Sequence, residues 1–404
     1  MMADGALTGL KVLEFGNLVS AAYCGKLMAD LGAEVIKIEE PGRGDEARRR
    51  GPFAGDEPGL ERSGLFAYLN TNKLSLTLDP KTDEGKAVFM ELVKDADILI
   101  ENNPPPVMDE LGLTYEVLEK INPMLIMTSI TAFGQTGPYR NYKAYELNSF
   151  HGGGHGFVTS ATLEEPVPTP VKAGGRQSQF GAGVTSAVAT LTAVFARDNI
   201  GAGQHVDVSI QEIMAGQYEA AIEMWTYMEN EIGGVSVAII GPVMPLPCKD
   251  GWIHLMCVED HEYDRFVEAM GNPEWADNEL FADRFKRGEY LDVLAVFLAE
   301  WTLERTKEEV FKTAQAARVP VGPAYTSEEV VNSEHLNARG FFVEIDHPEI
   351  GRVKYPGRPY RFSETPWKIE RPAPLLGEHN EQILRGRLGY SKRDMENWSG
   401  RKII

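Results

Sequence analysis

The stretch ADLGAEVIKIEEPGRGD, residues 29–45, carries the pattern that decides the fold. Its centre, residues 34–38, has the alternation and branched side chains of a strand. Residues 10–15 have the same character, and residues 23–31 between the two runs have the periodicity of a helix. A strand, a helix and a second strand in this order predict a parallel sheet flanked by helices, as in Rossmann-like folds.

The alternation continues along the first half of the chain. Residues 84–95 read as a helix and residues 98–100 as the next strand. Residues 182–195 are small and apolar, a composition typical of a buried helix, and residues 205–210 alternate like a strand. We therefore expect an α/β fold with a Rossmann-like large domain.

The middle of the chain has a different character. From residue 251, a strand pattern is followed by charged amphipathic helices at 260–270, 290–300 and 307–317, which indicates a smaller α+β domain. The Pro- and Gly-rich segment after residue 339 is expected to return to the first domain. The predicted organisation is a large domain of residues 1–225 and 331–404, with linkers, and a small domain of residues 226–330.

The amino-acid composition limits which macromolecules the protein is expected to bind and in which cellular compartment it is expected to lie. The 404 residues carry 60 acidic and 40 basic side chains, for a formal net charge of −20. A nucleic-acid or anionic membrane surface calls for a dominant basic patch, so neither partner is expected. No leader pattern and no run approaching the ~20 apolar residues of a membrane helix is evident. Cys24, Cys248 and Cys257 are too irregularly spaced for a zinc or redox motif. We expect a cytoplasmic protein without a metal site.

Short motifs along nearly the whole chain resemble those of the class III CoA-transferase (CaiB/BaiF-like) family, which also contains α-methylacyl-CoA racemases. They include LTGL (7–10), ADLGAEVIKIE (29–39), FGQTGP (133–138), DGW (250–252), PVGP (320–323) and RPAPLLGEH (371–379). The resemblance implies an interlocked dimer, in which each chain threads through a hole in the other. It also implies coenzyme A as a substrate of the complex rather than a tightly bound cofactor.

The resemblance places the family's catalytic aspartate 25 residues before Gln204, where this chain has Gln179. Such a transferase needs an ionised carboxylate that attacks a thioester, carries the acyl group and then takes CoA itself. A glutamine amide can hydrogen-bond a carbonyl or carboxylate, but it is a poor nucleophile. Between Glu165 and Asp198 no other carboxylate occurs, so no neighbour in the sequence replaces it.

The chain also departs from the family pattern at residues that are expected to bind CoA. Leu74 and Glu110 stand where the resemblance implies arginines, whose planar fork suits phosphate. Three segments also differ from their family counterparts: Ser20-Ala21-Ala22 replaces Gly-Pro, residues 101–106 replace the turn on the adenine side, and residues 236–241 replace a run of glycines. We expect weak CoA binding, with Lys73, Asn102 and Lys143 as candidate contacts.

Some site-like residues persist. Tyr145 and Glu146 resemble the Tyr-Glu pair that flanks the active site in formyl-CoA transferase-like members. A structural or dimer-contact role is the commoner one for such a carboxylate, and a catalytic role the rarer one. Arg176 is suited to clamp a substrate carboxylate or to pair with an acidic group of a partner, and we favour the second role.

Three functions remain open. The favoured one is a non-catalytic subunit of a heteromeric CoA-transferase, paired with a homologous chain that keeps its aspartate, as in succinyl-CoA:(R)-benzylsuccinate CoA-transferase. That complex would move CoA from succinyl-CoA to an aryl- or alkyl-succinate-type dicarboxylate. The second is an active transferase that uses Glu146. The third is an isomerase of the racemase branch, which is disfavoured because its histidine and aspartate would fall at Tyr145 and near Gln179.

Overall fold

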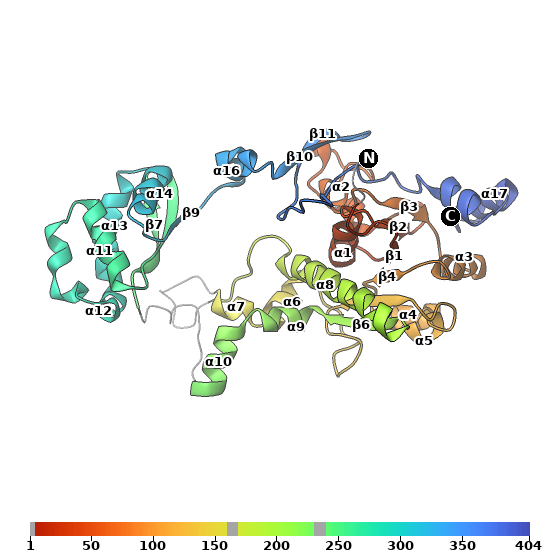
Figure 1. The fold of residues 1–404 in the computed structure, drawn as a ribbon, viewed down its shortest axis with the longest axis horizontal. Coiled ribbons are helices and arrows are strands. Elements are labelled where there is room, and N and C mark those ends of the chain that lie inside the picture. The colour runs from red at the N-terminus through yellow and green to blue at the C-terminus, as the bar shows by residue number, and fades with distance from the viewer. Residues whose placement is uncertain (1–4, 160–168, 230–239) are drawn as a thin grey trace. The chain divides into compact units, whose positions relative to one another are not determined.

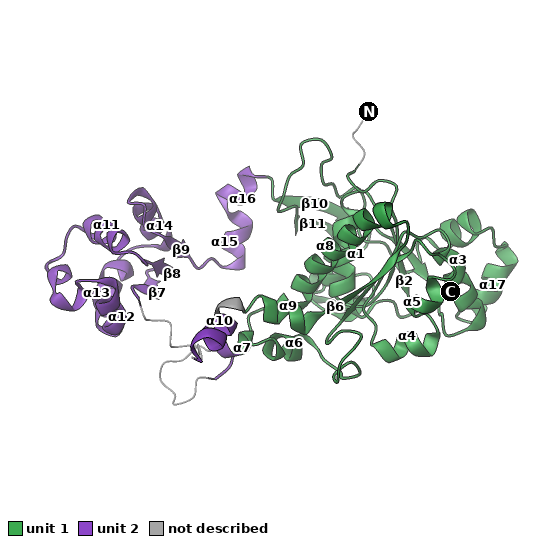
Figure 2. Cartoon of the chain, turned by 60° about the horizontal axis from the view of Figure 1, so that its bottom comes forward, with its two compact units in different colours: residues 1–156, 172–219, 340–404 green, residues 157–171, 220–339 purple. Residues whose placement is uncertain are grey.

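The structure, a computed structural model, describes residues 5–159, 169–229 and 240–404. The chain forms two compact units, coloured green and purple in Figure 2. Unit 1 comprises residues 1–156, 172–219 and 340–404, and unit 2 comprises residues 157–171 and 220–339. The C-terminal segment therefore belongs to the same unit as the N-terminal strands.

Unit 1 is built on a six-stranded sheet whose neighbouring strands all pair in parallel. The strands are β1 Lys11–Phe15, β2 Glu34–Glu39, β3 Leu74–Thr77, β4 Ile98–Glu101, β5 Ile126–Thr131 and β6 Gln204–Ser209. Their order, β3-β2-β1-β4-β5-β6, is that of a Rossmann sheet and reverses direction between β1 and β4. The predicted α/β fold is confirmed.

Helices cover both faces of this sheet (Figure 1). The helices of unit 1 are α1 Ser20–Ala29, α2 Gly64–Leu69, α3 Asp83–Val93, α4 Pro105–Leu111, α5 Tyr115–Leu118, α6 Glu146–Gly152, α8 Gln177–Ile200, α9 Ile210–Gly216 and α17 Lys392–Gly400, with the shorter segments η1 Glu46–Arg49, η2 Ala54–Asp56 and the π-helical η5 Glu381–Arg387. Helix α7, His155–Val158, spans the boundary between the units.

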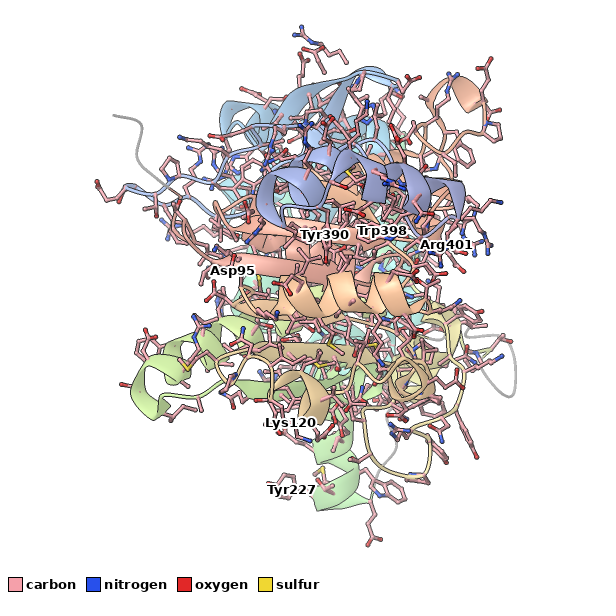
Figure 3. All side chains as sticks on the ribbon, turned by 90° about the vertical axis from the view of Figure 1, so that its right-hand side faces the viewer. Asp95, Lys120, Tyr227, Tyr390, Trp398 and Arg401 are labelled. Atoms are coloured by element: carbon pink, nitrogen blue, oxygen red, sulfur yellow. The ribbon has the colours of Figure 1, made fainter. Side chains whose placement is uncertain are left out.

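Two apolar cores lie on opposite faces of the sheet because strand side chains alternate. One contains Leu13 and Leu99 with Phe89 of α3 and Trp398 of α17, and the other contains Val12 and Ile98 with residues of α1 and α8. Figure 3 shows Tyr390 beside Trp398, with ring centroids 4.8 Å apart. The C-terminal helix is thus packed into the core of the N-terminal strands.

The sequence predicted a buried helix over residues 182–195, and helix α8, which spans these residues, differs from this expectation in its burial. Among the described residues it is the one helix long and apolar enough to cross a membrane, judged by length and composition alone. Its Ala182, Ala187 and Ala193 are instead packed into the sheet core. The helix is not buried all round: Val184, Val188 and Phe195 are 45%, 62% and 75% exposed. The helix is also longer than the predicted segment, because it begins at Gln177 and ends at Ile200.

Unit 2 contains the antiparallel sheet β7-β8-β9, with strands Val243–Cys248, Gly251–Met256 and Val321–Pro323. Its helices are α10 Glu219–Met228, α11 Asp260–Met270, α12 Arg284–Glu289, α13 Leu291–Leu303, α14 Lys307–Ala316, α15 Ser327–Asn332 and α16 Glu334–Ala338, with η3 Glu274–Asp277 and η4 Glu279–Phe281. The hairpin β10 Phe342–His347 and β11 Gly351–Pro356 belongs to unit 1. Residues 236–239 of the segment expected to replace a glycine run lie outside the described residues.

Candidate functional site

A pocket of about 640 Å³ opens at the carboxyl edge of the sheet in unit 1, where the strand order reverses. Ligands bind at such a switch point in Rossmann-like sheets because the loops diverge there and leave a crevice. Loops after β1, β2, β4 and β5 line it, together with the first turn of α8. We call this cavity the switch-point pocket.

Gln179 lies in the wall of the switch-point pocket. It is in the first turn of α8, a 24-residue helix, and is half-buried. The first turn is the positive end of the helix dipole, which favours an anionic group nearby. The residue in the place expected for the nucleophile therefore faces the pocket with a neutral amide.

Glu146 lies directly behind this turn. Its carboxylate accepts hydrogen bonds from the backbone N–H of Ser178 at 3.1 Å, the Ser178 hydroxyl at 2.6 Å and the backbone N–H of Gln179 at 3.3 Å. No side chain of α8 itself caps the helix. Glu146, at the start of α6, thus satisfies N–H groups that the helix leaves without partners, and its charge suits the dipole.

Asn102 joins the two loops on either side of the strand-order reversal. Its Oδ1 accepts from the backbone N–H of Asn17 at 2.8 Å, and its Nδ2 donates to the Asn17 carbonyl at 2.8 Å and to Ser20 Oγ at 2.9 Å. A Cβ at Gly16 would lie 2.6 Å from Asn102 Oδ1 and 2.5 Å from Ala21 Cβ. Asn102 lines the pocket, but its side-chain polar atoms are hydrogen-bonded to the loop after β1 and to Ser20.

The wall also holds charged and aromatic side chains that the sequence reasoning missed. Arg43, Arg49 and Arg140 line the pocket with the predicted Lys143, against two carboxylates, Glu40 and Glu46. Beside Arg140 the rings of Phe133, Tyr139 and Tyr142 cluster, with centroids 4.9 to 6.5 Å apart. Position was an available signal for Arg43 and Arg49, which follow the predicted strand at residues 34–38. Arg140 and the aromatic residues follow β5, which was not predicted as a strand. The pocket is thus locally basic in an acidic chain.

Lys73 lies outside this wall, in a buried ionic network. Its Nζ is 2.7 Å from Glu14 and donates to the Ala22 carbonyl and to Asn70 Oδ1. Lys37 binds the other Glu14 oxygen at 2.7 Å. Burial lowers the pKa of Lys73 to about 8, although Glu14 opposes this shift. The Lys73 ammonium is therefore engaged inside the protein.

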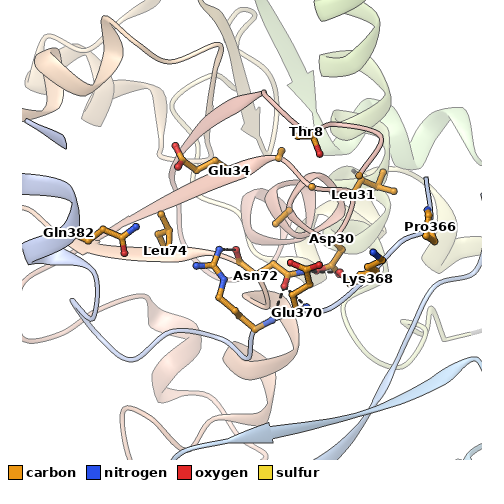
Figure 4. Close-up of a pocket in the computed structure, with 15 residues that line it drawn as sticks. Thr8, Asp30, Leu31, Glu34, Asn72, Leu74, Pro366, Lys368, Glu370 and Gln382 are labelled. Carbon is orange, nitrogen blue, oxygen red and sulfur yellow. Dashed lines mark hydrogen bonds between the residues drawn. The ribbon is translucent and has the colours of Figure 1, made fainter. Parts of the chain in front are cut away.

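The structure places Leu74 away from the switch-point pocket, and the expected loss of a phosphate contact there stays a prediction. Leu74 is the first residue of β3, so it lies at the amino edge of the sheet, opposite the switch-point pocket. It belongs to the apolar core and lines a separate cavity of about 380 Å³ beside Asp30 and Lys368 (Figure 4). Glu110 is exposed on α4, near the pocket in sequence but not among its lining residues.

The remaining predicted site residues separate into two groups. Tyr145 and Lys143 line the switch-point pocket with Asn102 and Gln179, so the structure brings these four together. Arg176 occupies the N-cap position of α8 and does not line the pocket. Among the described residues, no group of three or more His, Cys, Asp and Glu side chains could hold a metal ion.

A family model for CoA-transferase family III matches residues 7–380. The chain belongs to this family. A succinyl-CoA–L-malate CoA-transferase alpha subunit of Chloroflexus aurantiacus is 33% identical over 406 residues, which cover 98% of this chain and 92% of the relative. A succinyl-CoA–D-citramalate CoA-transferase of the same species is 32% identical, with 98% of each chain covered. A formyl-CoA:oxalate CoA-transferase of Bradyrhizobium diazoefficiens is 32% identical, covering 96% and 94%.

The solved structures agree. A CAIB/BAIF family protein from Brucella suis superposes with a TM-score of 0.83 at 30% identity, covering 95% of this chain and 99% of the other. Family membership and these relatives, which include two transferases named for succinyl-CoA, support a CoA-transferase-related role for this member of family III.

Proposed function

We propose that this chain is the non-catalytic subunit of a heteromeric CoA-transferase that moves CoA from succinyl-CoA to a substituted succinate. The observation that carries the proposal is the position of Gln179. It lies in the wall of the switch-point pocket where family resemblance expects the nucleophile, and an amide cannot form the anhydride and thioester intermediates of CoA transfer.

The nearby carboxylates support this reading. Glu146 uses both oxygens to cap α8, and a nucleophile bound in this way would have to release the helix before it attacked. Glu40 and Glu46 line the pocket, but their side chains are about half exposed and face Arg43 and Arg50 at 3.6 and 3.7 Å. Neither has the desolvated surroundings that activate a carboxylate.

A homologous partner with an intact aspartate would supply the chemistry. Its carboxylate attacks the succinyl-CoA carbonyl, forms a succinyl anhydride and releases the CoA thiolate, which then attacks the aspartyl carbonyl and frees succinate. The acceptor carboxylate attacks the aspartyl–CoA thioester, forms a second anhydride and releases the CoA thiolate. The thiolate then attacks the acceptor carbonyl of this anhydride, which gives the new thioester and frees the aspartate. This chain contributes half of the fold and a pocket wall.

The relatives suggest the acceptor class. Malate and citramalate, named for two of them, are both succinates with a substituent on the carbon chain. The rings of Phe133 and Tyr142 line the pocket with Lys143 and favour an acceptor with a flat apolar substituent beside its carboxylates, such as an arylsuccinate. One named relative is an alpha subunit, which supports a partner chain.

Co-expression of this chain with its homologous partner tests the proposal. The complex should transfer CoA from succinyl-CoA to benzylsuccinate or malate, and Asp→Asn at the partner's nucleophile should abolish turnover while assembly persists. This chain alone should be inactive, and borohydride or hydroxylamine should trap no adduct on it. Full activity of this chain alone, with an acyl or CoA adduct on Glu146, would show instead that it is an active transferase.

A further inference from the structure

Glu101 is a buried carboxyl group in the frame of the switch-point pocket. It ends β4, has no exposed surface, and stands in register with Phe15, Ser129 and Asp207 across four parallel strands. Its Oε2 accepts from the backbone N–H of Asn103 at 2.7 Å. Its Oε1 is buried and has no hydrogen-bond partner in the part of the chain that the structure describes.

Among the described residues, Glu101 forms no ion pair of the kind that Glu14 has with Lys37 and Lys73. Strand β1 contributes the apolar Phe15, and β5 contributes Ser129, whose hydroxyl hydrogen-bonds His205 Nε2 of β6 at 2.9 Å. Strand β6 also contributes Asp207, whose negative charge opposes ionisation of Glu101. On α4, Asp109 and Glu110 are exposed.

These surroundings favour a bound proton on Glu101. A carboxylate removed from water without a countercharge is destabilised relative to the neutral acid. Burial raises the pKa of Glu101 to about 7, although Ser129 and Asn103 favour the carboxylate and lower it in part. Burial also lowers the pKa of His205, so the neighbouring imidazole does not supply a positive charge at neutral pH.

Glu101 is coupled to the pocket through the turn that follows it. Asn103 donates its backbone N–H to Glu101 and its side-chain Nδ2 to the Phe15 carbonyl at 2.8 Å. Asn102, Asn103 and residues 104–107 line the pocket. The buried carboxyl group is thus hydrogen-bonded directly to a residue of this wall, and a charge in the pocket therefore acts on Glu101 through protein rather than through bulk water.

We infer that the switch-point pocket binds an anionic ligand together with a proton, and that Glu101 is the group that takes up this proton. The entering anion disfavours a second negative charge nearby, so the Glu101 carboxylate accepts a proton from solvent and becomes a neutral acid. No other bond changes. The inference rests on the proposed function only for the identity of the anion, a CoA thioester or CoA itself.

Infrared titration of the full chain between pH 5 and 9 tests this. The wild type should show a protonated-carboxyl band that disappears with a midpoint near neutral pH. Saturating CoA should move the midpoint upward by half a pH unit or more. Glu101→Gln should lack this band, and Glu364→Gln, a change at an exposed glutamate, should retain it. A band unchanged by Glu101→Gln, or a midpoint unmoved by CoA and by pyrophosphate, overturns the inference.

The second anion separates this inference from the proposed function. If pyrophosphate moves the midpoint and CoA does not, the pocket is proton-coupled but is not a CoA site. If the complex transfers CoA but no anion moves the midpoint of the carboxyl titration, the proposed function is supported and the proton uptake by Glu101 is contradicted. The wild-type titration decides the coupling even if Glu101→Gln fails to fold.

Discussion

Glu146 and Ser178, 32 residues apart in sequence, form a helix cap between two elements: the Glu146 carboxylate accepts from both the backbone N–H and the hydroxyl of Ser178. The cap fixes the turn that holds Gln179 against the switch-point pocket. A carboxylate in this place therefore has a structural use that does not depend on catalysis by this chain.

Removal of that cap should destabilise unit 1. Glu146→Gln weakens charge-assisted hydrogen bonds to an otherwise uncapped helix, and we expect a loss of about 1–2 kcal/mol in the free energy of unfolding. Urea titration of Glu146→Gln, Ser178→Ala and the double mutant measures the coupling between the pair. Glu364→Gln is the matched control. If the two single losses simply add, the two residues do not interact as described.

Lys73 and Lys11 offer a comparison between a buried and an exposed ion pair of equal length. Lys73 Nζ is 2.7 Å from Glu14 with both side chains fully buried, and Lys11 Nζ is 2.7 Å from Asp95 with side chains 41% and 56% exposed. Lys73→Met leaves a buried carboxylate short of one partner and should cost about 3–5 kcal/mol. Lys11→Met should cost less than about 1 kcal/mol. Equal losses in denaturant titrations would contradict the buried network.

Gly16→Ala should disturb the brace between the loops after β1 and β4. The added methyl group would overlap Ala21 Cβ and Asn102 Oδ1, and relief of that overlap should cost about 1–3 kcal/mol and shift the pocket wall. Gly174→Ala, where an added Cβ meets no atom within 4 Å, is the control. A Gly16→Ala variant with unchanged melting temperature would argue against the close packing of this turn.

The pH dependence of the free energy of unfolding should reveal the raised pKa of Glu101. Its pKa lies near 7 in the folded chain against an ordinary value of 4.5. Between these values the folded chain holds a proton that the unfolded chain releases. Stability therefore falls as pH rises from about 4.5 to 7, by roughly 3 kcal/mol in total. Glu101→Gln should flatten this part of the profile. Identical slopes for both proteins in urea unfolding between pH 5 and 8 would show that Glu101 is ionised throughout.

The exposed apolar face of α8 should be needed for assembly with a partner chain. Val188→Glu places a charge on the surface formed with Val184 and Phe195, and we expect the co-expressed complex to dissociate in sedimentation or pull-down experiments. Val117→Glu, at another partly exposed valine of unit 1, should leave assembly unchanged. A complex that tolerates Val188→Glu would place the interface elsewhere.

Local pattern was enough for four of the six strands of the parallel sheet, whereas β3 and β5 were not predicted. The loss of the nucleophile rests on the family resemblance and stays a prediction. Residues 34–38 and 98–100 were predicted as strands and lie within β2 and β4, because alternation and branched side chains act over a few residues. The lack of any carboxylate between Glu165 and Asp198 is a property of composition alone. Neither the strand assignments nor the absence of a carboxylate in this segment required knowledge of which segments lie close together in the folded chain.

Tertiary structure decided what surrounds those elements. Leu74, where the family resemblance implied a phosphate-binding arginine, lies at the amino edge of the sheet, and Lys73 is paired with Glu14 rather than facing the pocket. Arg43 and Arg140, almost a hundred residues apart, line one cavity only because parallel strands bring their carboxyl ends to the same edge. Burial of a charged group and the pairing of distant side chains depend on contacts across the whole unit, which no single stretch of sequence specifies.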